Sequence, residues 1–109
     1  YNEIFSTEEF QKIKSENPAF LIYLSHENCS VCKVLKPKVH DLIIENFPKI
    51  SLFYCDTINS SELAAQLGVF AVPTILVYFE GREFFRISRN ISINELNQSI
   101  ERPYSLIFE

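Results

Sequence analysis

The sequence predicts an α/β fold in which a mixed central sheet lies between helices on both faces. Runs with helical spacing alternate with apolar runs of strand length, and this order ends in a hairpin and a helix. The chain has 109 residues, of which 47% are hydrophobic, and this is enough for a core of its own. We therefore expect one domain, residues 1–109.

Composition and charge limit the classes of partner. A net charge of −4 argues against a nucleic-acid-binding surface, and every apolar run falls short of the ~20 residues of a membrane span. We therefore expect that the protein binds neither nucleic acid nor a membrane. We also expect it to be a monomer. Three cysteines cannot form a closed set of structural disulfides, which favours a reducing compartment, the cytoplasm.

The first helix and first strand have clear local signals. Ser6 stands three residues before Glu9, a capping box, and Phe10 and Ile13 follow at helical spacing. Asn17-Pro18 ends this helix. The continuous apolar run Ala19–Ser25 then has the length of a strand that is covered on both faces.

A second helix runs from Ser30 to about Phe47. Its apolar positions repeat every three or four residues, at Val31, Leu35, Val39, Leu42 and Ile43. Pro37 lacks an amide and should kink this helix, and Pro48 ends it.

The next strand and helix are shorter. Ile50–Cys55 is rich in β-formers and predicts a second strand. Asn59 with Glu62 three residues later predicts a capped helix through Leu67, which Gly68 ends.

The last third of the chain predicts a hairpin and a final helix. Thr74–Phe79 and Phe84–Ser88 flank a Gly-containing turn. Ser92 begins a capped helix that should stop before Pro103, and the tail Tyr104–Glu109 is apolar without an assigned role.

The cysteine pair Cys29-x-x-Cys32 stands where the first strand gives way to the second helix, so it lies at the carboxyl end of a strand. Such a pair can close a disulfide, bind a metal or pack in a core. The amides and dipole of a helix N-terminus would favour the Cys29 thiolate and lower its pKa from about 8.5. Cys29 would then attack a disulfide, and Cys32, one turn deeper, would resolve the mixed disulfide.

Three features together resemble the thioredoxin family. They are Cys-Ser-Val-Cys-Lys followed by Pro37, the segment Ala71–Thr74 (Ala-Val-Pro-Thr), and Phe-Glu-Gly-Arg at the hairpin. The resemblance spans nearly the whole chain. It implies a thioredoxin-like fold and a thiol–disulfide oxidoreductase that exchanges Cys29-Cys32 with protein disulfides, mainly as a reductant, without a cofactor. A thioredoxin-reductase-like enzyme would recycle it.

The resemblance also implies a substrate groove. The bond between Val72 and Pro73 would be cis and face the cysteines, and the Val72 backbone would pair with the substrate as an added strand. Both residues are therefore candidate substrate-binding residues.

Several positions depart from the family pattern. Asn28 replaces the tryptophan before the first cysteine, and Tyr23 stands where typical members have a buried aspartate. The lysine opposite that aspartate is replaced by Leu52 or Tyr54, and a groove glycine aligns with Arg89. Redox potential and substrate specificity should therefore differ.

These departures keep a second hypothesis open, a thioredoxin-like binding or redox-switch module with little turnover. A third, less favoured, is a metal site in which His26, Cys29 and Cys32 are joined by His40 or Cys55. A lone strand cysteine such as Cys55 is more often a small buried hydrophobe, and we treat it as structural.

Two further sets of side chains near the motif have plainer interpretations. Lys33 and Lys36 fit a solvated helix face. Phe70 could contact substrate in place of the tryptophan, or pack in the core. We name none of the three as a site residue.

Overall fold

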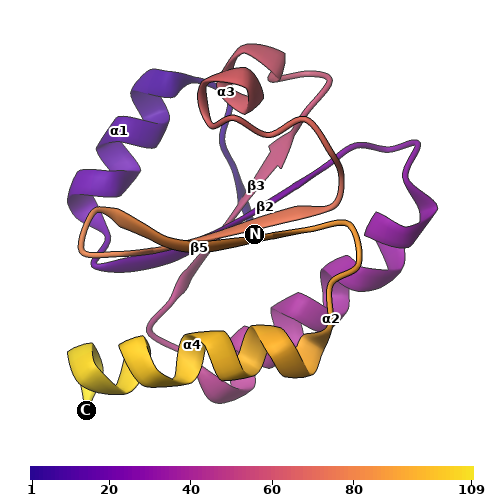
Figure 1. The fold of residues 1–109 in the computed structure, drawn as a ribbon. Coiled ribbons are helices and arrows are strands. Elements are labelled where there is room, and N and C mark those ends of the chain that lie inside the picture. The colour runs from indigo at the N-terminus through magenta and orange to yellow at the C-terminus, as the bar shows by residue number, and fades with distance from the viewer.

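A computed structural model describes residues 1–109 and shows five strands and four helices (Figure 1). The strands are β1 (Asn2–Glu3), β2 (Ala19–Ser25), β3 (Ser51–Asp56), β4 (Thr74–Phe79) and β5 (Arg82–Ser88). The helices are α1 (Thr7–Glu16), α2 (Ser30–Asn46), α3 (Ser61–Gln66) and α4 (Ile93–Phe108). None of the helices combines the length and the apolar character that a membrane crossing requires.

The strands form one mixed sheet in the order β1-β3-β2-β4-β5. β1, β3 and β2 run parallel, whereas β4 is antiparallel to both β2 and β5. Helices α1 and α3 cover one face, and α2 and α4 cover the other (Figure 1). This arrangement confirms the predicted α/β sandwich with helices on both faces.

The central strand β2 explains why both faces need cover. All seven of its residues are buried, as its continuous apolar run predicts. Alternate side chains go to opposite cores: Leu21 and Tyr23 pack toward α2 and α4, while Phe20 and Ile22 pack toward α1 and α3. Because side chains pack on both faces of β2, the strand fixes the point at which the loop after Ser25 leaves the sheet.

The end of α4 differs from the prediction. The helix does not stop before Pro103 but continues through it to Phe108. Tyr104 is buried, packs edge-on against Phe47, and its hydroxyl accepts a hydrogen bond from the Lys49 amide at 3.2 Å. An interior proline costs a helix roughly 3 kcal/mol, and this apolar packing of the last turns offsets it. Tyr104 is therefore part of the core, and Ile107 and Phe108 pack against it, whereas Leu106 is 75% exposed.

The start of α3 is the second difference. Asn59 and Glu62 do not form a capping box; the cap is Ser60, whose side chain makes no capping bond. Asp56 holds the turn that leads into α3, because its carboxylate accepts hydrogen bonds from the amides of Ile58 and Asn59 at 2.9 and 3.0 Å. The short edge strand β1 had no signal in the sequence at all.

The hairpin between β4 and β5 is as expected but tighter. Phe79 pairs with Arg82, so the turn is the two residues Glu80 and Gly81, both with positive φ. The register shifts by one residue beside Val77. Pairing continues to Arg82, so β5 begins two residues earlier than predicted.

Candidate active site

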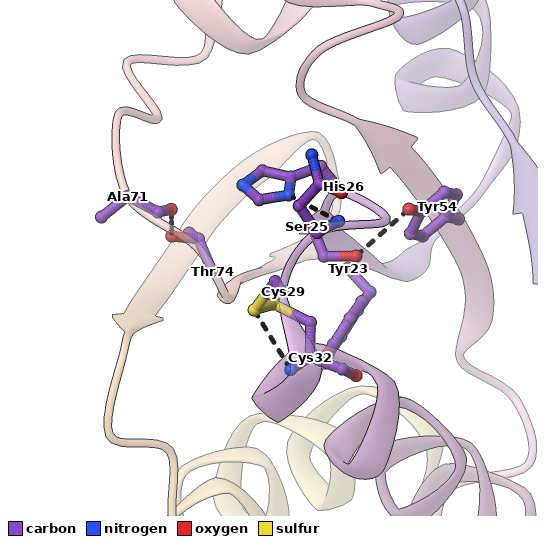
Figure 2. The surroundings of a disulfide bond; sticks show 9 residues. Tyr23, Ser25, His26, Cys29, Cys32, Tyr54, Ala71 and Thr74 are labelled. Atoms are coloured by element: carbon purple, nitrogen blue, oxygen red, sulfur yellow. Dashed lines mark hydrogen bonds between the residues drawn. A yellow bond between two sulfur atoms is a disulfide. The ribbon is translucent and has the colours of Figure 1, made fainter.

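The cysteine pair lies where the backbone leaves β2 and enters α2 (Figure 2). Cys29 and Cys32 form a disulfide, with 5.2 Å between their Cα atoms. Cys29 is the N-cap of α2, and its Sγ accepts a hydrogen bond from the Cys32 amide at 3.2 Å. The first turn of α2 contains no carboxylate. Amide donors and the helix dipole therefore face Cys29 without a negative charge in that turn, which favours a thiolate there.

The two cysteines differ in exposure. Cys32 is only 1% exposed and belongs to the core beneath α2, whereas Cys29 is only partly buried. A partner disulfide can therefore reach Cys29 from solvent and cannot reach Cys32 directly. This asymmetry suits a sequential exchange in which the outer sulfur reacts first.

Tyr23 lies beneath the pair at the position where the resemblance predicts a carboxylate. Its hydroxyl donates a hydrogen bond to the carbonyl oxygen of Cys32 at 2.8 Å, in a fully buried setting (Figure 2). Burial, with a smaller effect of neighbouring Tyr54, raises the pKa of Tyr23 to about 12. A phenol that stays neutral at pH 7 cannot serve as a general base, so Tyr23 holds the first turn of α2 in place.

Further tyrosines and a lysine surround Tyr23. Tyr54 stacks on Tyr23 with ring centroids 6.5 Å apart, and its hydroxyl accepts a hydrogen bond from Ser25 at 3.1 Å. The ammonium of Lys36 lies 3.7 Å from the Tyr54 ring centroid. Tyr1 donates to the Lys36 carbonyl at 2.8 Å. Lys36 is thus held against aromatic rings rather than fully solvated, which corrects the expectation for that residue.

The Val72–Pro73 step directly precedes β4. This peptide bond is cis. The Thr74 hydroxyl donates to the Ala71 carbonyl at 2.6 Å, which closes the turn before β4 (Figure 2). The Arg89 amide donates to the Pro73 carbonyl at 2.7 Å, so the segment after β5 is tied to the same turn.

Phe70 and Arg89 stand out as surface residues near this turn. Phe70 is 87% exposed, so the core-packing alternative for it is wrong. It lines a small cleft with His26 and Val72. Arg89 adopts a left-handed backbone with φ of 66°, where the family pattern has glycine. The sequence singles out both positions, but no sequence pattern shows that both side chains are exposed.

The cysteines and histidines do not assemble into a metal site. No three His, Cys, Asp or Glu side chains are placed to hold a metal ion. Cys55 belongs to the core on the α1 and α3 face, whereas Cys32 lies in the other core. His40 contacts Asp41 and the ring of Tyr1. The predicted ligand sets with His40 or Cys55 are therefore wrong, and Cys55 is buried as expected.

Comparison with known proteins agrees with this geometry. The family model described as Thioredoxin matches residues 2–102. The chain belongs to the thioredoxin family. A thioredoxin-like protein of Bacillus subtilis, YdfQ, is 32% identical over 105 residues, which cover 96% of this chain and 90% of that protein.

Solved thioredoxin structures share the fold. Thioredoxin 1 of Thermosipho africanus has a TM-score of 0.74 and 33% identity, and the match covers 83% of this chain and 99% of that one. Oxidised mitochondrial thioredoxin 3 of Saccharomyces cerevisiae has a TM-score of 0.83 and 23% identity, with 92% of both chains covered. Family, fold and a cysteine pair at disulfide distance make this thioredoxin-family protein a thiol–disulfide oxidoreductase.

Proposed function

We propose that the protein, acting as one domain over residues 1–109, reduces protein disulfides, with Cys29 as nucleophile and Cys32 as resolving cysteine. The observation that carries this assignment is the N-cap position of Cys29, whose Sγ accepts the Cys32 amide hydrogen bond at 3.2 Å. A thiolate at that sulfur gains the same hydrogen bond in a stronger, charge-assisted form.

The exchange takes place in two steps. The Cys29 thiolate attacks one sulfur of the substrate disulfide, forming a mixed disulfide and releasing the first substrate thiolate, which takes up a proton. Cys32 loses its proton and attacks the Cys29 sulfur, which releases the second substrate thiolate. The Cys29-Cys32 dithiol is thereby oxidised by two electrons, and the substrate disulfide is reduced to two thiols.

Val72 and Pro73 would shape the substrate groove. Val72 is only partly buried and lines the same cleft as the exposed Phe70. An extended substrate segment could pair with the Val72 backbone as an added strand, so that main-chain hydrogen bonds supply affinity independent of sequence. Phe70 would add an apolar contact at this edge, in place of the missing tryptophan.

The direction and the recycling partner are also part of the proposal. A reductant must regain two electrons after each cycle, and a thioredoxin-reductase-like enzyme is the class of partner that supplies them to this family. The unpaired, buried Cys55 is compatible with a reducing compartment such as the cytoplasm.

Cysteine variants test the roles. We expect Cys29→Ser to abolish reduction of insulin disulfides with dithiothreitol as electron source, and Cys32→Ser to lose turnover while retaining the first step. Cys55→Ala is the matched control, since Cys55 is the only other cysteine and should be dispensable for turnover. Insulin reduction retained by Cys29→Ser would overturn the assignment.

One observation favours the second candidate, a redox-switch module with little turnover. Tyr23 occupies the place of the carboxylate that the family uses near the resolving cysteine, and with a pKa of about 12 it cannot accept a proton at pH 7. A switch would cycle between dithiol and disulfide but show insulin reduction close to the uncatalysed rate with dithiothreitol. Turnover well above that rate rejects the switch.

A further inference from the structure

A wide cleft is lined by Ser30 and Val31, the two residues that separate the cysteines in the chain. It has a volume of about 630 Å³ and lies between the first half of α2 and the loop that joins β5 to α4. Its walls include Val31, which stands between the two cysteines, and Val34 and Ile91. Val31 and Val34 are 62% and 60% exposed, so the first turns of α2, where both cysteines lie, present an apolar surface.

The charges in this cleft are of one sign. Lys38 and Arg89 line it, and none of the other lining residues is charged. Both side chains are exposed, and neither forms an ion pair or a side-chain hydrogen bond within the chain, where the salt bridges are Arg86–Glu83 and His40–Asp41. The chain as a whole has a net charge of −4, so this basic cleft contrasts with the acidic protein around it.

The backbone at Arg89 is costly for an arginine. With φ of 66°, it lies in the left-handed region, where a residue other than glycine loses roughly 1 kcal/mol. The amide of Arg89 donates to Pro73 at 2.7 Å, and glycine would provide the same amide without strain. The backbone alone would favour glycine at this position. The arginine is therefore explained by its side chain, which suggests that the guanidinium has a function.

We propose that Arg89 and Lys38 select protein disulfides that are flanked by carboxylates. The carboxylates would pair with the two basic side chains, while apolar residues of the same segment contact Val31 and Val34. A guanidinium binds a carboxylate through two parallel hydrogen bonds, which gives direction as well as charge. This inference rests on the proposed function, because it concerns the substrate of the same cysteine pair.

Matched peptides test the proposal. Three synthetic peptides share one intramolecular disulfide and the same apolar residues, and carry Glu, Gln or Lys at the flanking positions. Reduced protein in excess is mixed with each peptide, and the appearance of peptide thiols gives a single-turnover rate. We expect the Glu peptide to react about three- to tenfold faster than the Lys peptide, and added salt to reduce that ratio.

Variants assign the preference to residues. Arg89→Gln and Arg89→Gly should each bring the Glu-to-Lys rate ratio close to one, the glycine also removing the backbone strain. Lys38→Gln should also lower the Glu-to-Lys rate ratio. Because Lys38 lies on a regular helix, this variant leaves the backbone at Arg89 unchanged. Arg82→Gln is the control, because Arg82 is also an exposed arginine of the hairpin but does not line this cleft.

The outcomes separate the two levels of the argument. If reduced wild-type protein reduces none of the three peptides, the proposed function fails. If it reduces all three at equal rates, or if both Arg89 variants and the Lys38 variant keep the wild-type ratio, the function stands and the selectivity is refuted.

Discussion

Removal of the Tyr23 hydroxyl should lower stability and leave the chemistry intact. Tyr23→Phe deletes the hydrogen bond to the Cys32 carbonyl, which measures 2.8 Å and is fully buried. The ring, which fills the core beneath α2, is unchanged. The variant therefore isolates one donor from the packing around it.

The magnitude follows from the kind of bond. A neutral buried hydrogen bond contributes about 1 kcal/mol net, and the carbonyl of Cys32 keeps its helical partner. For a domain of about 100 residues, a loss of that size lowers the midpoint of thermal unfolding by about 4 °C. Tyr78→Phe is the matched control: Tyr78 is also buried, its pKa is also about 12, and its hydroxyl makes no hydrogen bond within the chain. We expect it to shift the midpoint much less.

The rate of exchange separates a positioning role from a catalytic one. Because burial holds the pKa of Tyr23 at about 12, the phenol is neutral at pH 7 and accepts no proton. The rate of insulin reduction by Tyr23→Phe should stay within about twofold of wild type, whereas loss of a general base typically costs about 10²-fold or more. A rate that falls about a hundredfold with an unchanged unfolding midpoint would refute this reasoning.

Three other predictions concern residues away from Tyr23. Phe70→Ala should raise KM for protein disulfides several-fold and leave the unfolding midpoint almost unchanged, because the side chain is 87% exposed; an unchanged KM would contradict a substrate contact. Burial, then Asp56, raises the pKa of Cys55 to about 11, so its thiol ionises first in the unfolded state. The free energy of unfolding should therefore fall as pH rises from about 9 to 11, and Cys55 should contribute up to about 1.4 kcal/mol per pH unit to this fall. Denaturant titrations of Cys55→Ala at several pH values should lack this contribution to the pH dependence. Gly81→Ala should cost about 1 kcal/mol in the same titrations through its φ of +80° alone, since nothing lies within 4 Å of an added Cβ; an unchanged midpoint would show that the turn relaxes.

Much of the fold was predictable because its signals are local. The buried run Ala19–Ser25, the capping Ser6 and the presence of a hairpin turn at Gly81 each follow from neighbouring residues. The predictions failed where distant contacts decide. α4 continues through Pro103 because Tyr104 packs against Phe47, more than fifty residues away in the chain, and no local pattern contains that contact.

The candidate site shows the same division. The sequence was enough to place Cys29 at a helix N-terminus and Val72-Pro73 before a strand. It could not show that Phe70 is exposed, that Tyr23 bonds to the Cys32 carbonyl, or that Arg89 shares a cleft with Lys38. Each of these facts depends on how segments that are distant in the chain pack together, and no local spacing specifies it.

Trapping the mixed disulfide tests the central claim most directly. Reduced Cys32→Ser protein is mixed with a protein disulfide, quenched with acid and digested, and mass spectrometry identifies the cysteine that carries the substrate. We predict a single adduct on Cys29, the partly exposed N-cap of α2, and none on Cys55, which is fully buried. An adduct on Cys55, or no adduct at all under conditions where the wild-type protein reduces the substrate, would contradict the account.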